Sequence, residues 1–425
     1  MLLLLVILLV LIAASVPIAY SLGVATFVFF LADDPQLIQV LPQRFFAGMN
    51  SYALITLPLF ILMGLVMNAG QITARLIEFS LIFVGRLRGG LGMVNVFASM
   101  LFGGISGSSA SDTASIGSVL IPEMEKRGYP RAFASGITVA SSTMGMIIPP
   151  SIPIVLYSVV SQESVGRLFL GGVIPGIMVG VLQLAFTLAI SRRRGYPREP
   201  VAGGWRDALN QTVRSSPVLF MPFFVVGSVV FGIATATESA ALGVVYALGI
   251  GFLVTRAMSL GAFRECLRSA ARTSAMIMLI IAFSQVYIWV LALERVPESI
   301  AGYVVNLGLG PIATLLVIDV IILVAGTVID VSPAILLLTP VFLPALQEAG
   351  VSPVHFGIIL VSGLAVGACT PPVGNCLNVC AAISKLGIGT IFRGAAPFLA
   401  ANVATMLLIT VFPDLVLWLP GVLME

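Results

Sequence analysis

The chain has 425 residues, of which 59% are hydrophobic and only 9% are charged, and its formal net charge is +3. A soluble domain carries roughly a quarter charged residues, so this composition excludes a water-facing globular protein. Recurring apolar runs, without the alternating ten-residue segments of a barrel, favour a membrane protein built of helices. The small net charge gives no indication of nucleic-acid binding.

The chain begins with an apolar stretch over residues 1–31. No basic segment precedes it and no small-residue cleavage site follows, so we expect a retained membrane helix rather than a signal peptide. We divide it at Ser15-Val16-Pro17, because the region that matches it later in the chain breaks at Ala236–Ser239.

A second apolar stretch, over about 90–125, is interrupted by GGISGSSASD at residues 103–112. Basic residues flank it on both sides, so both of its ends should lie on one side of the membrane. We therefore predict a hairpin that enters the membrane and returns. The next span, about 133–160, is broken by SSTMGMIIPPS at 141–151, because Pro-Pro removes two N–H donors and disfavours helix before it.

Residues 191–216 hold six arginines and little apolar sequence, which predicts a cytoplasmic linker. Helices at 217–233 and 239–254 should then go out and back, turning at ATATES. A third helix is expected at 274–293. The arginines that precede it, and so fall on the cytoplasmic side, are Arg256, Arg264, Arg268 and Arg272.

The second half repeats the pattern of the first. A hairpin is predicted over about 311–347, broken by GTVIDVS, and a span over about 355–384 is broken by GACTPPVGN. Gly and Pro residues match between the halves at a constant offset of 222, as Gly104 does with Gly326. These residues set backbone shape, so what repeats is a backbone path.

Equivalent loops of the two halves carry opposite charge bias. Residues 75–88 contain three arginines, whereas the matching residues 297–310 contain no Lys or Arg. This is the signature of two halves inserted upside down relative to each other. We predict an all-α polytopic membrane protein with two inverted-topology repeats, 1–190 and 217–425. It would have about ten transmembrane helices plus two re-entrant hairpins, and both termini would be periplasmic.

The four breaks suggest binding sites. Backbone without helical hydrogen bonds is tolerated at membrane depth only where it is buried in protein or lines a polar cavity. Free carbonyls near Gly145–Ile148 and Gly367–Thr370 would suit Na⁺, and the N-termini of the resumed helices favour anions. The pattern therefore predicts a small anionic solute with Na⁺ beside it. The alternative is that the small residues only allow close helix packing.

Several polar residues need separate interpretations. Asp112 and Asp330 are expected to be functional, with helix capping as the alternative, because a carboxylate at the bilayer centre costs roughly 2.5–3.5 kcal/mol. Glu238 and Asp319 are expected to be structural or interfacial, and His355 to lie at a surface or in a loop. A metal site at Cys376 and Cys380 would need a cysteine or histidine pair elsewhere, and the one histidine stands alone, so the cysteines are expected to pack. They are Cys266, Cys369, Cys376 and Cys380.

Long motifs in both halves resemble the large membrane subunit of TRAP (tripartite ATP-independent periplasmic) transporters. They include GGISGSSASDTASIGSVLIPEMEKRGYPRAFASGITVASSTMGMIIPPSIP, ATATESAALGVVYAL, GTVIDVSPAILLLTPVFLPAL and GLAVGACTPPVGNCLNV. The resemblance implies a Na⁺-driven importer of organic acids in the bacterial inner membrane, with an elevator-type transporter fold. It also implies two partners, a separate four-helix small membrane subunit and a periplasmic substrate-binding protein.

The resemblance further implies Na⁺ sites between each hairpin tip and its partner broken helix, with the solute between the tips. The first Na⁺ site would comprise Gly104, Ser106, Ser108, Gly145 and Ile148. The second would comprise Gly326, Asp330, Gly367, Thr370 and Val373. The solute contacts would be Ser106, Ser108, Ser109, Pro150 and Asn375.

Other functions stay open from sequence alone. GISG at 104–107 matches the serine motif of rhomboid-type intramembrane proteases, which need a histidine base at similar depth; His355, expected in a loop, does not fit. A stand-alone Na⁺/anion symporter without a binding protein is the main alternative, and a passive channel is a third.

Overall fold

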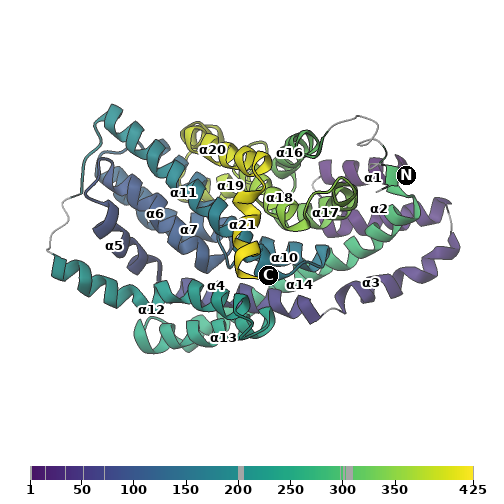
Figure 1. Cartoon of the computed structure of the whole chain (residues 1–425), viewed down its shortest axis with the longest axis horizontal. Coiled ribbons are helices and arrows are strands. Elements are labelled where there is room, and N and C mark those ends of the chain that lie inside the picture. The colour runs from purple at the N-terminus through teal and green to yellow at the C-terminus, as the bar shows by residue number, and fades with distance from the viewer. Residues whose placement is uncertain are drawn as a thin grey trace.

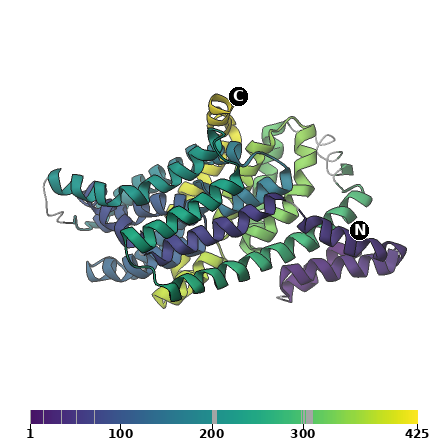
Figure 2. The same cartoon turned by 90° about the horizontal axis from the view of Figure 1, so that it is seen from below.

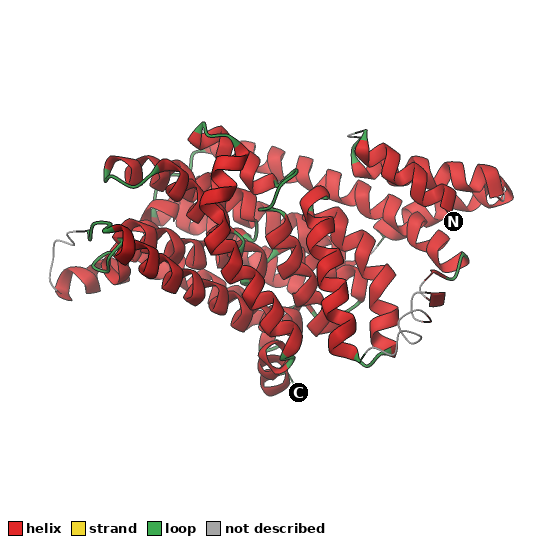
Figure 3. Ribbon diagram, turned by 90° about the horizontal axis from the view of Figure 1, so that it is seen from above, coloured by secondary structure: helices red, strands yellow, loops and turns green. Residues whose placement is uncertain are grey.

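The computed structural model describes residues 2–424 except 15, 34, 51, 71, 200–204, 297, 300–301 and 303–309. Within that part the chain is helical and contains no strand (Figure 3). The helices before the first hairpin are α1 (Leu2–Ala13), α2 (Ile18–Asp33), η1 (Pro35–Val40), α3 (Leu41–Met49), η2 (Tyr52–Ile55), α4 (Thr56–Ala69) and α5 (Ile72–Val84). The hairpin and the rest of the first half form α6 (Gly90–Ser106), α7 (Ser109–Lys126), α8 (Arg131–Ser142), α9 (Met144–Ile147), α10 (Ile152–Ser161) and α11 (Val165–Arg194). The second half forms α12 (Trp205–Val230), α13 (Ala236–Gly249), η3 (Ile250–Val254), α14 (Leu260–Leu293), α16 (Pro311–Val328), α17 (Val331–Glu348), α18 (Pro353–Gly367), α19 (Asn375–Ser384), α20 (Ile388–Val411) and α21 (Asp414–Leu423).

Eight described helices, or up to nine if the bent pair α4 and α5 is one span, are long and apolar enough to cross a membrane. The chain is therefore a multi-pass membrane protein. That number includes α16 and α17, the two arms of the second predicted hairpin. The expected total of ten spans plus two hairpins, the division into inverted repeats and the periplasmic termini stay predictions.

The N-terminal apolar stretch forms two helices with a break between Ala13 and Ile18, as the sequence predicts. Leu4, Leu22 and Phe30 pack with Tyr287 and Val290 of α14 in a hydrophobic cluster separate from the main core. These N-terminal helices lie at one end of the long axis, and α5 and α6 lie at the other (Figures 1 and 2).

Two helices, α6 and α7, cover the residues of the first predicted hairpin. Its arms α6 and α7 are interrupted only at Gly107 and Ser108, where Gly107 has a φ of +63° that favours glycine. The start of α6 and the end of α7 contact the same piece of the linker. The N–H groups of Gly89 and Gly90 donate to Pro197 O at 3.1 and 3.2 Å, and Arg127 pairs with Glu199 at 2.5 Å. Both ends of this hairpin therefore lie on one side of the protein.

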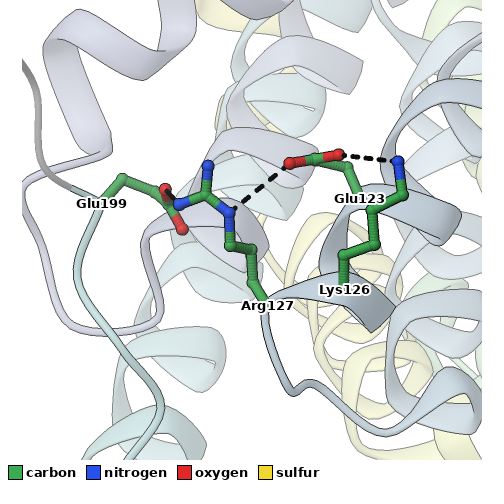
Figure 4. Close-up of polar contacts among 4 residues, drawn as sticks. All are labelled: Glu123, Lys126, Arg127 and Glu199. Carbon is green, nitrogen blue, oxygen red and sulfur yellow. Dashed lines mark hydrogen bonds and ion pairs between the residues drawn. The ribbon is translucent and has the colours of Figure 1, made fainter.

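Arg127 also pairs with Glu123, 3.5 Å away in the preceding turn of α7, and Lys126 lies 3.5 Å from the same carboxylate (Figure 4). Glu199 is buried, with 8% of its surface exposed, whereas the other three side chains are open to solvent. Because the Arg127–Glu199 pair has one buried partner, it is screened less than an ordinary surface ion pair. It fastens the base of the hairpin to the linker.

The breaks after each hairpin also lie where the sequence predicts them. One separates α9 from α10 at residues 148–151, and the other separates α18 from α19 at residues 368–374. The carbonyls expected to be free are partly bonded. Ser151 Oγ donates to Met146 O, Gly367 O accepts from Thr370 N at 2.9 Å, and Ala368 O accepts from Cys376 N at 3.1 Å. The expectation of free carbonyls is therefore wrong at these three positions, because Ser151 and Thr370 within the breaks, and Cys376 after the second break, supply donors.

Two further expectations about helices are wrong. The helix expected at 274–293 begins at Leu260, so Arg264, Arg268 and Arg272 lie on α14 rather than in a loop. Ser259 caps its first turn by accepting from Ala262 N, and no Pro or Gly stops the helix between 262 and 293. The linker is also partly helical: α11 extends to Arg194 and α12 begins at Trp205. Most of residues 297–310, the counterpart of the arginine-containing loop 75–88, lie outside the described residues.

His355 does not lie at a surface or in a loop. It belongs to the first turn of α18, is 2% exposed, and its Nε2 lies 2.7 Å from Ile409 O on α20. The reason is that Pro353 occupies the first turn of α18, where a missing N–H costs nothing, so the helix starts two residues before the histidine. The interpretation of the other two acids agrees with the structure. Glu238 forms a capping box with Thr235, and Asp319 is buried and accepts from Thr410 Oγ1 at 2.9 Å.

Candidate functional site

A cavity of about 520 Å³ lies where the two hairpin tips meet. Its polar wall comes from the hairpins and the broken helices, including Ser106, Ser108, Ser109, Asp330 and Asn375. Its other wall comes from α4 and α14, and the residues there are Ile61, Gly64, Leu65, Thr273, Met276, Ile277 and Ile280. The cavity is therefore bounded by two different sets of helices, one polar and one mostly apolar.

Four helices begin at this cavity. Ser109 starts α7, Ile152 starts α10, Val331 starts α17 and Asn375 starts α19, and all four residues line the wall. The first N–H groups of a helix have no intrahelical acceptor, and the helix dipole gives its N-terminus a partial positive charge. None of the described lining residues is Lys, Arg or His. In the described part of the wall, positive partial charge therefore comes from backbone N–H groups rather than from cationic side chains.

Four of the five predicted solute contacts lie in the cavity wall: Ser106, Ser108, Ser109 and Asn375. Pro150, the fifth, is buried behind the first tip, and a Cβ added to Gly107 would lie 3.1 Å from its carbonyl oxygen. The structure therefore brings together residues from both halves of the chain, as a contact of 3.0 Å between Ser109 Oγ and Cys376 Sγ also shows. Cys376 packs, as expected, against the first hairpin.

The first predicted Na⁺ site is compact. Ser106 Oγ lies 3.4 Å from Ser108 O and donates to Asp112 Oδ1. Gly104 lies beside the break, where an added Cβ would be 3.2 Å from Pro149 O. Ile148 is half-buried and its N–H donates to Met144 O at 2.8 Å. It is Gly103, rather than the predicted Gly104, that approaches Gly145, because a Cβ on Gly103 would lie 3.0 Å from the Gly145 backbone.

Asp112 was expected to be functional but was not assigned to a site. Its side chain is 1% exposed, and its Oδ2 has no hydrogen-bond partner among the described residues. A Cβ on Gly145 would lie 2.2 Å from that oxygen, so the carboxylate points at α9, the short helix just before the break at residues 148–151. A buried carboxylate oxygen without a partner is costly unless a cation or a proton meets it. The signal for Asp112 in the sequence is a carboxylate inside an apolar hairpin, which indicates a functional residue but not the site to which it belongs.

The second predicted Na⁺ site is more open. Gly326 and Gly367 touch, with an added Cβ on Gly367 only 2.5 Å from the Gly326 backbone. Asp330 is exposed to the cavity, and its Oδ1 accepts from Asn375 Nδ2 at 3.4 Å. Thr370 Oγ1 donates to Val366 O at 2.9 Å. Val373 is exposed, and its N–H donates to Thr327 O at 3.1 Å. This bond joins the break after α18 to the end of α16.

The arrangement does not suit a serine protease. The hydroxyl of Ser106 is bonded to Asp112, whereas His355 is bonded to Ile409 O in another part of the protein and is not among the residues that line the cavity. A nucleophilic serine needs a base within hydrogen-bond reach. The wall offers backbone dipoles, hydroxyls and one carboxylate, which are groups that bind ions.

Comparison with known proteins agrees with this chemistry. Residues 5–415 match the family model of the tripartite ATP-independent periplasmic transporter, DctM component. The chain is 36% identical over 401 residues to the C4-dicarboxylate TRAP transporter large permease protein DctM of Pseudomonas aeruginosa, covering 94% of both chains. It is 34% identical to the sialic acid TRAP transporter large permease protein SiaM of Vibrio cholerae, covering 96% of this chain and 95% of the relative.

A further relative and a solved structure extend the comparison. The isethionate TRAP transporter permease protein DctMQ of Oleidesulfovibrio alaskensis is 36% identical, and the match covers 96% of this chain but 64% of that longer protein. The crystal structure of the Alcanivorax borkumensis YdaH transporter matches with a TM-score of 0.65 at 15% identity, covering 89% of this chain and 88% of that one, which shows a shared fold. The named relatives are transporter permeases and not enzymes. The chain belongs to the DctM component family of the tripartite ATP-independent periplasmic transporters.

Proposed function

We propose that this chain imports a small organic anion together with Na⁺ across the bacterial inner membrane. The observation that carries the proposal is the meeting of four helix N-termini at one cavity without a cationic side chain. Such a wall attracts a carboxylate or sulfonate through backbone N–H groups. C4-dicarboxylates, sialic acid and isethionate, the compounds in the names of the relatives, are all organic anions.

Na⁺ accounts for the carboxylates beside this anion site. Asp112 and Asp330 add negative charge next to helix N-termini, which would weaken anion binding unless a cation accompanies the solute. Hydroxyl, carbonyl and carboxylate oxygens, the atoms present around Ser106 and Thr370, suit a hard cation. We assign Na⁺ to both tips as a co-transported substrate, with Asp112 added to the first site.

Movement of the hairpins as one body against the other helices would carry the solute. Polar contacts between the halves support a single moving unit: Ser109 Oγ on the first hairpin lies 3.0 Å from Cys376 Sγ on α19, and Cys369 Sγ contacts Val139 O on α8 at 3.4 Å. The facing wall of α4 and α14 is mostly apolar and makes close backbone contact, since a Cβ on Gly64 would lie 2.8 Å from Ser106 O. A mostly apolar wall suits an elevator mechanism, in which the hairpins slide along α4 and α14.

The proposal includes two partners, a small membrane subunit and a periplasmic binding protein, because the family is tripartite. The test is uptake by proteoliposomes that contain the chain, its small subunit and the binding protein encoded with it. Radiolabelled succinate, N-acetylneuraminate and isethionate are offered with an inward Na⁺ gradient or with K⁺ replacing Na⁺. We expect uptake of one of these acids only with Na⁺ and the binding protein. Equal uptake in K⁺ would overturn Na⁺ coupling, and equal uptake without the binding protein would favour a stand-alone symporter.

The second Na⁺ site has its own test. Asp330→Asn or Thr370→Val should raise the Na⁺ concentration for half-maximal uptake about tenfold, because each removes an interaction worth about 1.5 kcal/mol. Asp414→Asn, at an exposed carboxylate that starts α21, is the matched control and should leave it unchanged. An unaltered Na⁺ dependence in both site variants would remove these residues from the site.

A further inference from the structure

Three exposed arginines form a stripe on α14. Arg264, Arg268 and Arg272 are spaced by four residues, so they lie on one face of the helix at steps of about 6 Å. Among the described residues, the acidic partner on this stretch is Glu265, whose exposed carboxylate lies 3.7 Å from Arg268. The stripe therefore keeps a net positive charge.

The stripe leads directly to the cavity. The next position on the same face is Met276, four residues after Arg272, and Met276 lines the cavity wall. Thr273, the residue that follows Arg272, lines it as well and is exposed. Because the described cavity wall contains no Lys, Arg or His, Arg272 is the cationic side chain that α14 places next to the rim.

A preference for arginine on the cytoplasmic side explains the presence of positive charge in this region but not its arrangement. Arginines that only fix orientation need no common helix face. Here they share one face, and that face continues into the wall of the solute cavity. Charge lined up beside a low-dielectric cleft focuses the field and raises the local concentration of ions of opposite sign.

We propose that Arg264, Arg268 and Arg272 form an electrostatic approach that draws anions along α14 into the cavity and delays their loss from it. The identity of the anion as the transported acid rests on the proposed function. The positive potential along α14 does not rest on the proposed function, so it can be measured without transport.

The experiment measures this potential with charged thiol reagents. Thr273→Cys places a thiol in the cavity wall, in a chain whose four native cysteines, all buried, are replaced by serine. The purified protein in neutral detergent reacts with anionic 2-sulfonatoethyl methanethiosulfonate and with cationic 2-(trimethylammonium)ethyl methanethiosulfonate. The readout is the ratio of the two rates, corrected by the ratio for a free thiol.

We expect the anionic reagent to be favoured, and Arg264→Gln, Arg268→Gln and Arg272→Gln together to lower the ratio about tenfold at low salt. The effect should shrink at 1 M salt, where the screening length is about 3 Å. The matched control is the triple glutamine variant of Arg192, Arg193 and Arg194, three exposed arginines on α11, which supplies no residue to the cavity wall. An equal ratio in the α14 variant and its parent would overturn the proposal.

Acidic lipid headgroups are the other anions that such a stripe could bind. In nanodiscs containing phosphatidylglycerol, we expect the rate ratio to stay high, because the stripe attracts anions to the cavity rather than binding lipid headgroups. A fall to the value of the triple variant would assign the arginines to lipid and overturn the proposal. Failure of the parent transporter to move any tested acid would contradict the proposed function, while the rate ratio would still decide this inference.

Discussion

The two hairpin tips have the same backbone path but different surroundings. The first tip is enclosed: Ser109 and Asp112 are each 1% exposed, and both are in contact with polar neighbours. The second tip is open: Asp330 and Asn375 are exposed and share one long contact of 3.4 Å. The same backbone break is thus enclosed at the first tip and open at the second. The neighbours decide which, because unpaired backbone at a break is stabilised only by the groups packed around it.

The greatest loss of stability is expected from a glycine substitution at the base of the second tip. It tests whether this base is packed as tightly as that of the first tip. In Gly367→Ala the new Cβ meets the backbone of Gly326 at 2.5 Å, whereas in Gly145→Ala it meets the carboxylate of Asp112. Backbone yields less than a side chain, so we expect losses of about 3 kcal/mol and about 1 kcal/mol in unfolding free energy. Thermal unfolding in detergent measures both.

Gly387→Ala is the control, because nothing lies within 4 Å of a Cβ there. Equal melting temperatures for Gly367→Ala and this control would show that the second tip is loose down to its base and would extend the difference between the tips.

The next effect in size is a change in melting temperature that distinguishes the two carboxylates, Asp112 and Asp330. Asp112→Asn removes a buried charge with an unpartnered oxygen, so this variant should unfold at a higher temperature than the parent in KCl. It should also lose part of the stabilisation by NaCl, which reaches about 2.7 kcal/mol at one hundred times the dissociation constant. Asp330→Asn, at an exposed position, should leave the melting temperature in KCl unchanged. A parent protein that melts at the same temperature in NaCl and KCl would contradict a buried Na⁺ site at Asp112.

The smallest effect concerns the contacts between the halves. Ser109→Ala removes the 3.0 Å contact with Cys376 inside the protein and should cost about 1 kcal/mol. Asn375→Ala removes the 3.4 Å contact with Asp330 at the open tip and should cost less than about 0.5 kcal/mol. Chemical unfolding of the two variants in parallel measures the difference, and a larger loss for Asn375→Ala would reverse the assignment of the enclosed and open tips.

The positions of the breaks were predictable because their causes are local. The first hairpin was expected at 90–125 and runs from Gly90 to Lys126, and the second was expected at 311–347 and runs from Pro311 to Glu348. Pro-Pro cannot supply N–H donors, and glycine accepts the positive φ that a chain reversal needs, as at Gly107 and Gly374. These constraints act within a few residues and leave a clear mark in the sequence.

Other features depended on distant contacts and were missed. His355 is expected at a surface or in a loop because it follows Pro353 near the end of a span, whereas packing on α20 makes it part of a buried first turn. The start of α14 was placed 14 residues too late because charge was taken to mark a loop. An amphipathic helix tolerates arginines where one of its faces is exposed.

A helical membrane protein with four broken places in two matching sets can be predicted from the amino-acid sequence, because composition and the positions of Gly and Pro act locally. The meeting of four helix N-termini at one cavity, the direction of Asp112 toward Gly145, and the path of the α14 arginines to the cavity wall emerge from the folded arrangement. These arrangements join residues up to 267 positions apart, as between Ser109 and Cys376. Packing of whole helices sets such distances, and no local pattern encodes them.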